Sequence, residues 1–144
     1  METSARTPVH LWIVGVVAAL WNAIGATDYT MTQLRSPAIM AQMTPDQIAW
    51  LDSAPMVANA SWAFGVWGGL LGSLLLLARS RYAVWAFILS LAGLAVNTLY
   101  QMTAPMPSGH MDSTMAIAFH VLIWAIAIFL LVYALRMRRN GVLR

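Results

Sequence analysis

The chain has 144 residues, of which 60% are hydrophobic and 9% are charged, with a net charge of +3 at neutral pH. A soluble domain carries about 25% charged residues, so the composition excludes an ordinary water-soluble globule and favours a protein covered by lipid. The sequence has no cysteine, which excludes disulfides and thiolate metal sites. A chain of this length is expected to form one unit over residues 1–144.

Four apolar runs are long enough to cross a bilayer, which takes about 20 helical residues. They lie near residues 9–27, 55–78, 82–104 and 114–135. A lone span must satisfy its backbone hydrogen bonds internally, so the predicted fold is all-α, a membrane-embedded antiparallel four-helix bundle. The first run has some features of a signal peptide, but its length, the polar Asn22 and two tryptophans favour a retained span.

The arginines fall on one side of the predicted spans. Arg6 precedes the first span, Arg79 and Arg81 fill the second connection, and Arg136, Arg138, Arg139 and Arg144 follow the last. Only Arg35 lies on the opposite side, together with four of the five acidic residues. The positive-inside rule therefore predicts that both termini lie in the cytoplasm. The C-terminal arginines are interpreted as a topology anchor, with recruitment of anionic lipid or nucleic acid as the alternative, and we expect no nucleic-acid partner.

The connection after the first span predicts a short helix within "TPDQIAWLDSAP". Thr44 can cap its N-terminus, Pro45 suits the first helical position, and Gln47 completes a capping box. Ile48 and Leu51 share one face, so this helix is expected to lie on the membrane surface.

Small residues mark the faces on which the spans pack, because lipid gives helices little hydrophobic drive to associate. Ser61, Gly65, Gly69 and Ser73 recur every four residues along the second span. We interpret this face as the tightest contact of the bundle. The alternative use of the Gly65/Gly69 face is a homo-oligomer or a larger membrane complex.

Polar side chains gather towards the outer ends of the spans, with one amide or imidazole in each. At 1.5 Å per residue, these four groups are expected roughly 6–11 Å below the outer boundary. The predicted ligand-binding residues of this layer are Asn22, Asp28, Asn59, Asn97, Tyr100, Gln101 and His120. Such groups normally face the bundle interior, where they either bind a small polar ligand or hydrogen-bond across helices as glue.

Methionines are concentrated in the outer segments, where "QMTAPMPSGHMDSTM" joins the last two spans. Thioethers select Cu(I) and imidazole also suits copper, so Met106, His110 and Met111 could form a soft-metal loop. Pro105 and Pro107 prevent a continuous helix there, which favours a simple turn. No metal or other cofactor is assigned.

Catalytic and phosphate-binding motifs of common types are absent from the sequence. We therefore expect no enzyme activity.

The segments "LWNAIGATDYTMTQ", "TPDQIAWLDSAP" and "WAFGVWGGLLGSLLLLARSRYAVWAFILSLAGL" resemble a group of small uncharacterised four-span bacterial inner-membrane proteins. Some of these carry a generic "sugar transporter" label. The resemblance implies the fold and the membrane, and it provides no catalytic residues.

The sequence leaves three functions open. The first is a non-enzymatic membrane protein that binds a small polar or lipidic ligand in the outer layer, or that serves as an accessory subunit. The alternatives are a periplasm-facing copper-binding or copper-delivery protein and an oligomeric small-solute transporter.

Overall fold

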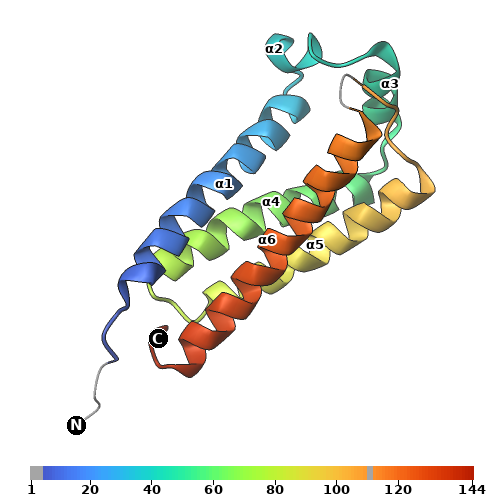
Figure 1. Ribbon diagram of the computed structural model, residues 1–144. Coiled ribbons are helices and arrows are strands. Elements are labelled where there is room, and N and C mark those ends of the chain that lie inside the picture. Colours follow the sequence, from blue (N-terminus) through green and yellow to red (C-terminus); the bar gives the residue numbers. More distant parts are fainter. Residues whose placement is uncertain (1–4, 110–111) are drawn as a thin grey trace.

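The computed structural model describes residues 5–109 and 112–144, and all of its regular structure in these ranges is helical (Figure 1). The helices are α1 (Val9–Gln33), α2 (Pro37–Met40), α3 (Pro45–Ser53), α4 (Met56–Leu77), α5 (Ala83–Thr103) and α6 (Ser113–Arg139). The four long helices α1, α4, α5 and α6 are each apolar enough to cross a membrane. The predicted all-α class, with four long apolar helices and a short one after the first, is confirmed.

Helix α4 packs against both α1 and α5, and these two pairs are the most closely packed in the chain. Gly15 of α1 faces Leu77 of α4, and Gly25 faces Val66. Residue numbers therefore rise along α1 as they fall along α4, which makes the two helices antiparallel.

Backbones meet almost directly between α4 and α5. A Cβ atom added to Gly93 would lie 2.6 Å from the carbonyl oxygen of Ser61 and 2.7 Å from the amide nitrogen of Gly65. The hydroxyl of Ser90 uses this proximity and donates a 2.6 Å hydrogen bond to the Gly65 carbonyl. Small residues thus form the tightest contact, as predicted, because only they let helix backbones approach this closely.

The predicted oligomer face is occupied within one chain. Gly65 lies against α5, and a Cβ on Gly69 would collide with the side-chain oxygen of Asn22 on α1. A homo-oligomer through the Gly65/Gly69 face would require α1 and α5 to move aside.

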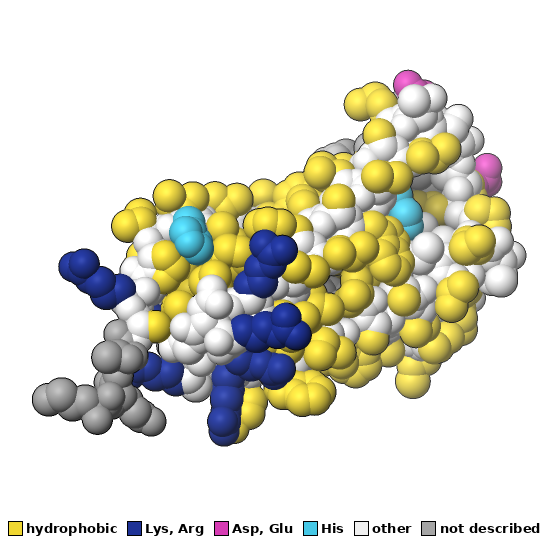
Figure 2. Space-filling model, turned by 60° about the horizontal axis from the view of Figure 1, so that its bottom comes forward, with side chains coloured by type: hydrophobic (Ala, Val, Ile, Leu, Met, Phe, Trp, Pro, Cys, Tyr) yellow, Lys and Arg dark blue, Asp and Glu magenta, His cyan; other side chains and the backbone are white. Residues whose placement is uncertain are grey.

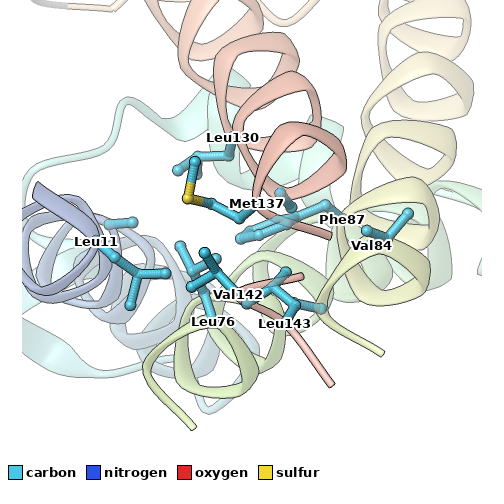
Figure 3. Close-up of a cluster of buried hydrophobic side chains, with 11 residues drawn as sticks. Leu11, Leu76, Val84, Phe87, Leu130, Met137, Val142 and Leu143 are labelled. Atoms are coloured by element: carbon cyan, nitrogen blue, oxygen red, sulfur yellow. The ribbon is translucent and has the colours of Figure 1, made fainter. Parts of the chain in front are cut away.

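The apolar core lies at the end of the bundle that carries the arginines, which we call the arginine end (Figure 3). The largest side chains there come from all four long helices and from the C-terminal tail: Leu11, Leu76, Val84, Phe87, Leu130, Met137, Val142 and Leu143. After α6, Gly141 adopts a φ of +71°, which turns the chain back so that the tail enters this core. The tail backbone then pairs with the α4–α5 turn, through Arg144 N to Arg79 O and Arg81 N to Arg144 O, both 2.8 Å.

Helix α6 is most exposed towards the opposite end, which carries Asp28, Asp46, Asp52 and Asp112 and which we call the acidic end. Every residue from Asp112 to Phe119 is exposed, and α6 packs mainly on α5. The main cluster of buried apolar side chains therefore lies at the arginine end, and the first two turns of α6 at the acidic end are exposed.

Two helices end on an arginine in the left-handed region of backbone conformation. Arg35 follows α1 with φ +53°, and Arg79 follows α4 with φ +56°. Glycine is favoured at this position of a helix end because it has no Cβ. Each arginine side chain has a partner: Arg35 forms a 2.6 Å ion pair with Asp52, and Arg79 donates to Thr7 Oγ1 at 2.9 Å.

The short helix α3 forms as predicted, with the Thr44–Gln47 capping box present in full. Its side chains also bind the α5–α6 connection. Gln47 Nε2 donates to the Pro107 carbonyl at 3.3 Å, and Trp50 Nε1 donates to the Ala104 carbonyl at 2.9 Å. The helix thus links the two connections at the acidic end.

We expect Gly93→Ala to lower the free energy of unfolding in detergent by about 1–3 kcal/mol, because the added methyl group must push apart two helix backbones. Gly25→Ala is the matched control. Its Cβ would make an ordinary 3.5 Å contact with Val66, so this variant should be as stable as the wild type or more stable. Thermal or denaturant unfolding followed by circular dichroism measures the difference, and equal stabilities of the two variants would contradict the tight α4–α5 contact.

Candidate functional site

Five of the predicted site residues, Asn59, Asn97, Tyr100, Gln101 and His120, lie towards the acidic end of α4, α5 and α6. Asn97 Nδ2 donates to the carbonyl of Ala58, the neighbour of Asn59, at 3.2 Å. Gln101 Nε2 donates to Asn97 Oδ1 at 2.7 Å. Tyr100 packs against Trp50 of α3 with the two rings tilted, and their centroids are 5.7 Å apart. The structure therefore brings these polar side chains of three helices to one end of the bundle.

Asn22 lies elsewhere, and its prediction at the same level is wrong. It donates to Ser73 Oγ of α4 at 3.2 Å and to the Ala18 carbonyl at 2.9 Å. Ser73 follows Asn59 by 14 residues, which is about 21 Å along α4. The reason is that α1 continues to Gln33, well beyond the predicted end at residue 27, so Asn22 lies deeper than its distance from that end indicates.

Asp28 is exposed, and the only ion pair among the described residues is Arg35–Asp52, so no pairing of Asp28 with His120 is present there. Asp28 follows Trp21 by seven residues, which is two helical turns. The ring of Trp21 contacts Phe119 of α6, with centroids 6.1 Å apart. Asp28 therefore shares the stripe of α1 that faces α6.

The hydroxyl of Thr98 is the centre of the contact between α5 and α6 at the acidic end. It donates its proton to the Leu94 carbonyl at 2.8 Å and accepts from Trp124 Nε1 at 3.2 Å. The ring nitrogen Nε2 of His120 lies 3.3 Å from the same oxygen. A hydroxyl has one proton and two acceptor sites, so this arrangement is satisfied when His120 carries its proton on Nε2.

Trp124 belongs to this group and was not among the predicted site residues. It follows His120 by four residues, so both side chains lie on one face of α6. This spacing of four residues is the sequence signal by which Trp124 could have been assigned to the same group as His120.

Asn59 belongs to a second polar group, between α1 and α4. Its Oδ1 accepts a 3.3 Å hydrogen bond from Gln33 Nε2. Beside them is a cavity of about 40 Å³, lined by Thr32, Gln33, Arg35, Leu51 and Asn59. At about 10–15 Å³ per water, this space suits a few waters and not an organic ligand.

A larger open groove of about 310 Å³ runs between α1 and α4 and contains none of the predicted site residues. It is lined by Ala23, Ala26, Thr27, Thr30, Met31, Trp67 and Leu70. The hydroxyls of Thr27 and Thr30 are bonded to carbonyls of their own helix, at 2.8 and 2.7 Å. The groove therefore presents a mainly apolar surface.

The methionine-rich connection is described as far as Gly109, and His110 and Met111 lie outside the described residues. In its described part, Met102 and Met106 are exposed, and no cluster of three or more histidine, aspartate or glutamate side chains suited to a metal occurs in residues 5–109 and 112–144. The backbone of this connection is held by Gln47 and Trp50 of α3. These contacts favour its role as a turn, and copper binding stays a prediction.

The fold defines a class, that of integral membrane proteins with four candidate spans. Comparison of the chain with protein-family models, with curated proteins and with solved structures finds no significant match. The four long apolar helices are consistent with the resemblance to small four-span membrane proteins, and no family is identified.

We expect Thr98→Val to lower the free energy of unfolding by about 1–2 kcal/mol, because the indole of Trp124 and the imidazole of His120 lose their common partner. Thr27→Val is the matched control, since its hydroxyl bonds only to its own helix. Denaturant unfolding in one detergent compares the two. An effect of Thr98→Val no larger than that of Thr27→Val would show that this hydroxyl does not join α5 to α6.

Proposed function

We propose that the chain is a non-enzymatic protein of the bacterial inner membrane that binds a small polar ligand, or the polar head of an amphiphile, at His120. The ligand site is the outer part of the space between α1 and α6, with Thr98 and Trp124 holding the imidazole from the α5 side. Both termini are in the cytoplasm, so the site faces the periplasm.

The observation that carries this proposal is the state of the His120 ring. Its Nε2 is held by Thr98, while its Nδ1 has no partner among the described residues. Among the described residues, every fully buried side-chain nitrogen or oxygen has a hydrogen-bond partner. Because Nδ1 has none, it is not fully buried in the protein. An unsatisfied ring nitrogen within a membrane span is costly, and a bound polar group removes that cost.

Asp28 supports the same location from the other helix. It lies on the stripe of α1 that faces α6, and the described residues provide it with no cation. A ligand that carries a hydrogen-bond donor for Nδ1 and a positive or donating group for the carboxylate would fit both side chains. The amides of the other predicted residues serve as glue: Asn59 accepts from Gln33 of α1, Asn97 donates to α4, and Gln101 donates to Asn97 within α5.

An accessory-subunit role is the second candidate, and the exposure of α6 favours it. Met115, Ile117 and Phe119 are each at least half exposed in the isolated chain. A helix of a partner protein would cover this segment in place of lipid.

The proposed orientation can be tested directly because the sequence has no cysteine. Ser108 and Asn140 are exposed at the acidic and arginine ends. In intact cells, Ser108→Cys should react with a membrane-impermeant maleimide, and Asn140→Cys should react only after the membrane is opened. The opposite pattern would invert the orientation and place the His120 site on the cytoplasmic side.

We expect gently purified chain to retain a small molecule that native mass spectrometry detects and that His120→Leu loses at least tenfold. Asn22→Leu is the control, because Asn22 lies in the α1–α4 contact, away from the site. If the two variants retain the molecule equally and differ only in thermal stability, His120 is glue. The same spectra count chains per particle, and a bound second protein would favour the accessory role.

A further inference from the structure

Five arginines from two separate segments meet at the arginine end, where Figure 2 shows dark-blue side chains gathered at one end of the molecule. We call these residues the arginine cluster: Arg79, Arg81, Arg136, Arg138 and Arg139. The first two lie in the α4–α5 turn and the others in the last turn of α6. The backbone pairing of the C-terminal tail with the turn holds the two segments together.

Two members of the cluster border the junction between the end of α6 and the start of α5. Arg138 follows His120 by 18 residues, which is five full turns, so it lies on the side of α6 that faces α5. Arg81 lies directly before α5, and its guanidinium is 5.5 Å from the ring centre of Tyr82. An anionic group between the end of α6 and the start of α5 would therefore meet both side chains.

No aspartate or glutamate side chain of the described residues lies at the arginine end. The described acidic residues, Asp28, Asp46, Asp52 and Asp112, lie at the acidic end, and the one ion pair formed there is Arg35–Asp52. Like charges held close together repel, and an anion from outside the chain would relieve this repulsion. Every member of the cluster is exposed and accessible to such an anion.

The position of the cluster favours a phospholipid as the source of that anion. The apolar core, with Val84, Phe87 and Leu143, lies at the same end, so the arginines stand where transmembrane helices end. This is the level of lipid headgroups. Guanidinium groups bind phosphate oxygens through paired hydrogen bonds, and basic clusters at span ends attract anionic lipid.

We infer that the arginine cluster is a binding site for an anionic phospholipid, whose phosphate is held between Arg81 and Arg138. The lipid joins the α4–α5 turn to α6, across the same junction that the C-terminal tail spans. This site lies at the opposite end of the bundle from His120 and is independent of the proposed ligand site.

The test uses purified full-length chain in a neutral detergent, titrated with phosphatidylglycerol or with phosphatidylcholine of the same acyl chains. Native mass spectrometry counts bound lipids, and the shift in melting temperature reports stabilisation. We expect phosphatidylglycerol to bind more tightly, with an affinity that falls as salt is raised. Inorganic phosphate at millimolar concentration forms a third arm and should neither displace the lipid nor reproduce the shift.

Replacing both arginines, as Arg81→Gln with Arg138→Gln, should weaken phosphatidylglycerol binding roughly 25-fold, about fivefold for each charge. Arg35→Gln at the acidic end is the matched control, because each of these substitutions removes one positive charge. It should leave the affinity for phosphatidylglycerol within about twofold of that of the wild type. Equal weakening by the control, equal binding of the two lipids, or displacement by free phosphate would each overturn the inference. The lipid and phosphate comparisons use the wild-type chain, so they decide the question even if the double variant does not fold.

Discussion

The close approach of α4 to its two neighbours is the constraint on which the rest of the structure depends. Gly93 meets the α4 backbone at distances that no side chain could occupy, and Gly69 leaves space only for Asn22. In lipid, apolar side chains gain little free energy by packing against one another. The close contact of helix backbones therefore provides the packing energy that the hydrophobic effect provides in the core of a soluble protein. The positions of α1 and α5 on α4 then determine the depth of every polar group that these helices carry.

The helices were predictable because their signals are local. Long apolar runs, the Thr44–Gln47 capping box and the repeat of small residues each need only a short stretch of sequence, and each is present in the structure. The depth of Asn22 was not predictable in this way. It depends on where α1 ends and on its register against α4, and the polar residues from Asp28 to Gln33 continue the helix without any change of backbone conformation.

The polar side chains illustrate a related limit. Their residue types indicate that each needs a partner, but the sequence does not say which partner it will find. Asn97 and Gln101 satisfy each other, and Asn22 bonds to Ser73, so their hydrogen bonds are used within the fold. Thr98 instead receives two donors from α6, and the Nδ1 nitrogen of His120 has no partner among the described residues. The distinction between glue and site thus depends on the pairing in three dimensions.

The uneven burial of the bundle bears on the two proposed binding regions, which differ in their chemistry. At the arginine end, the tail inserts Val142 and Leu143 between the helices, so any ligand must remain on the surface and meet exposed guanidinium groups. At the acidic end, the residues of α6 from Ser113 to Phe119 are exposed, and the helix is held to α5 through Thr98. A surface of fixed positive charge selects for anions, whereas an imidazole nitrogen and a carboxylate select for hydrogen-bond donors. The C-terminal tail thus fixes the arginine end of α6 in the core, whereas Thr98 of α5 holds this helix towards its acidic end.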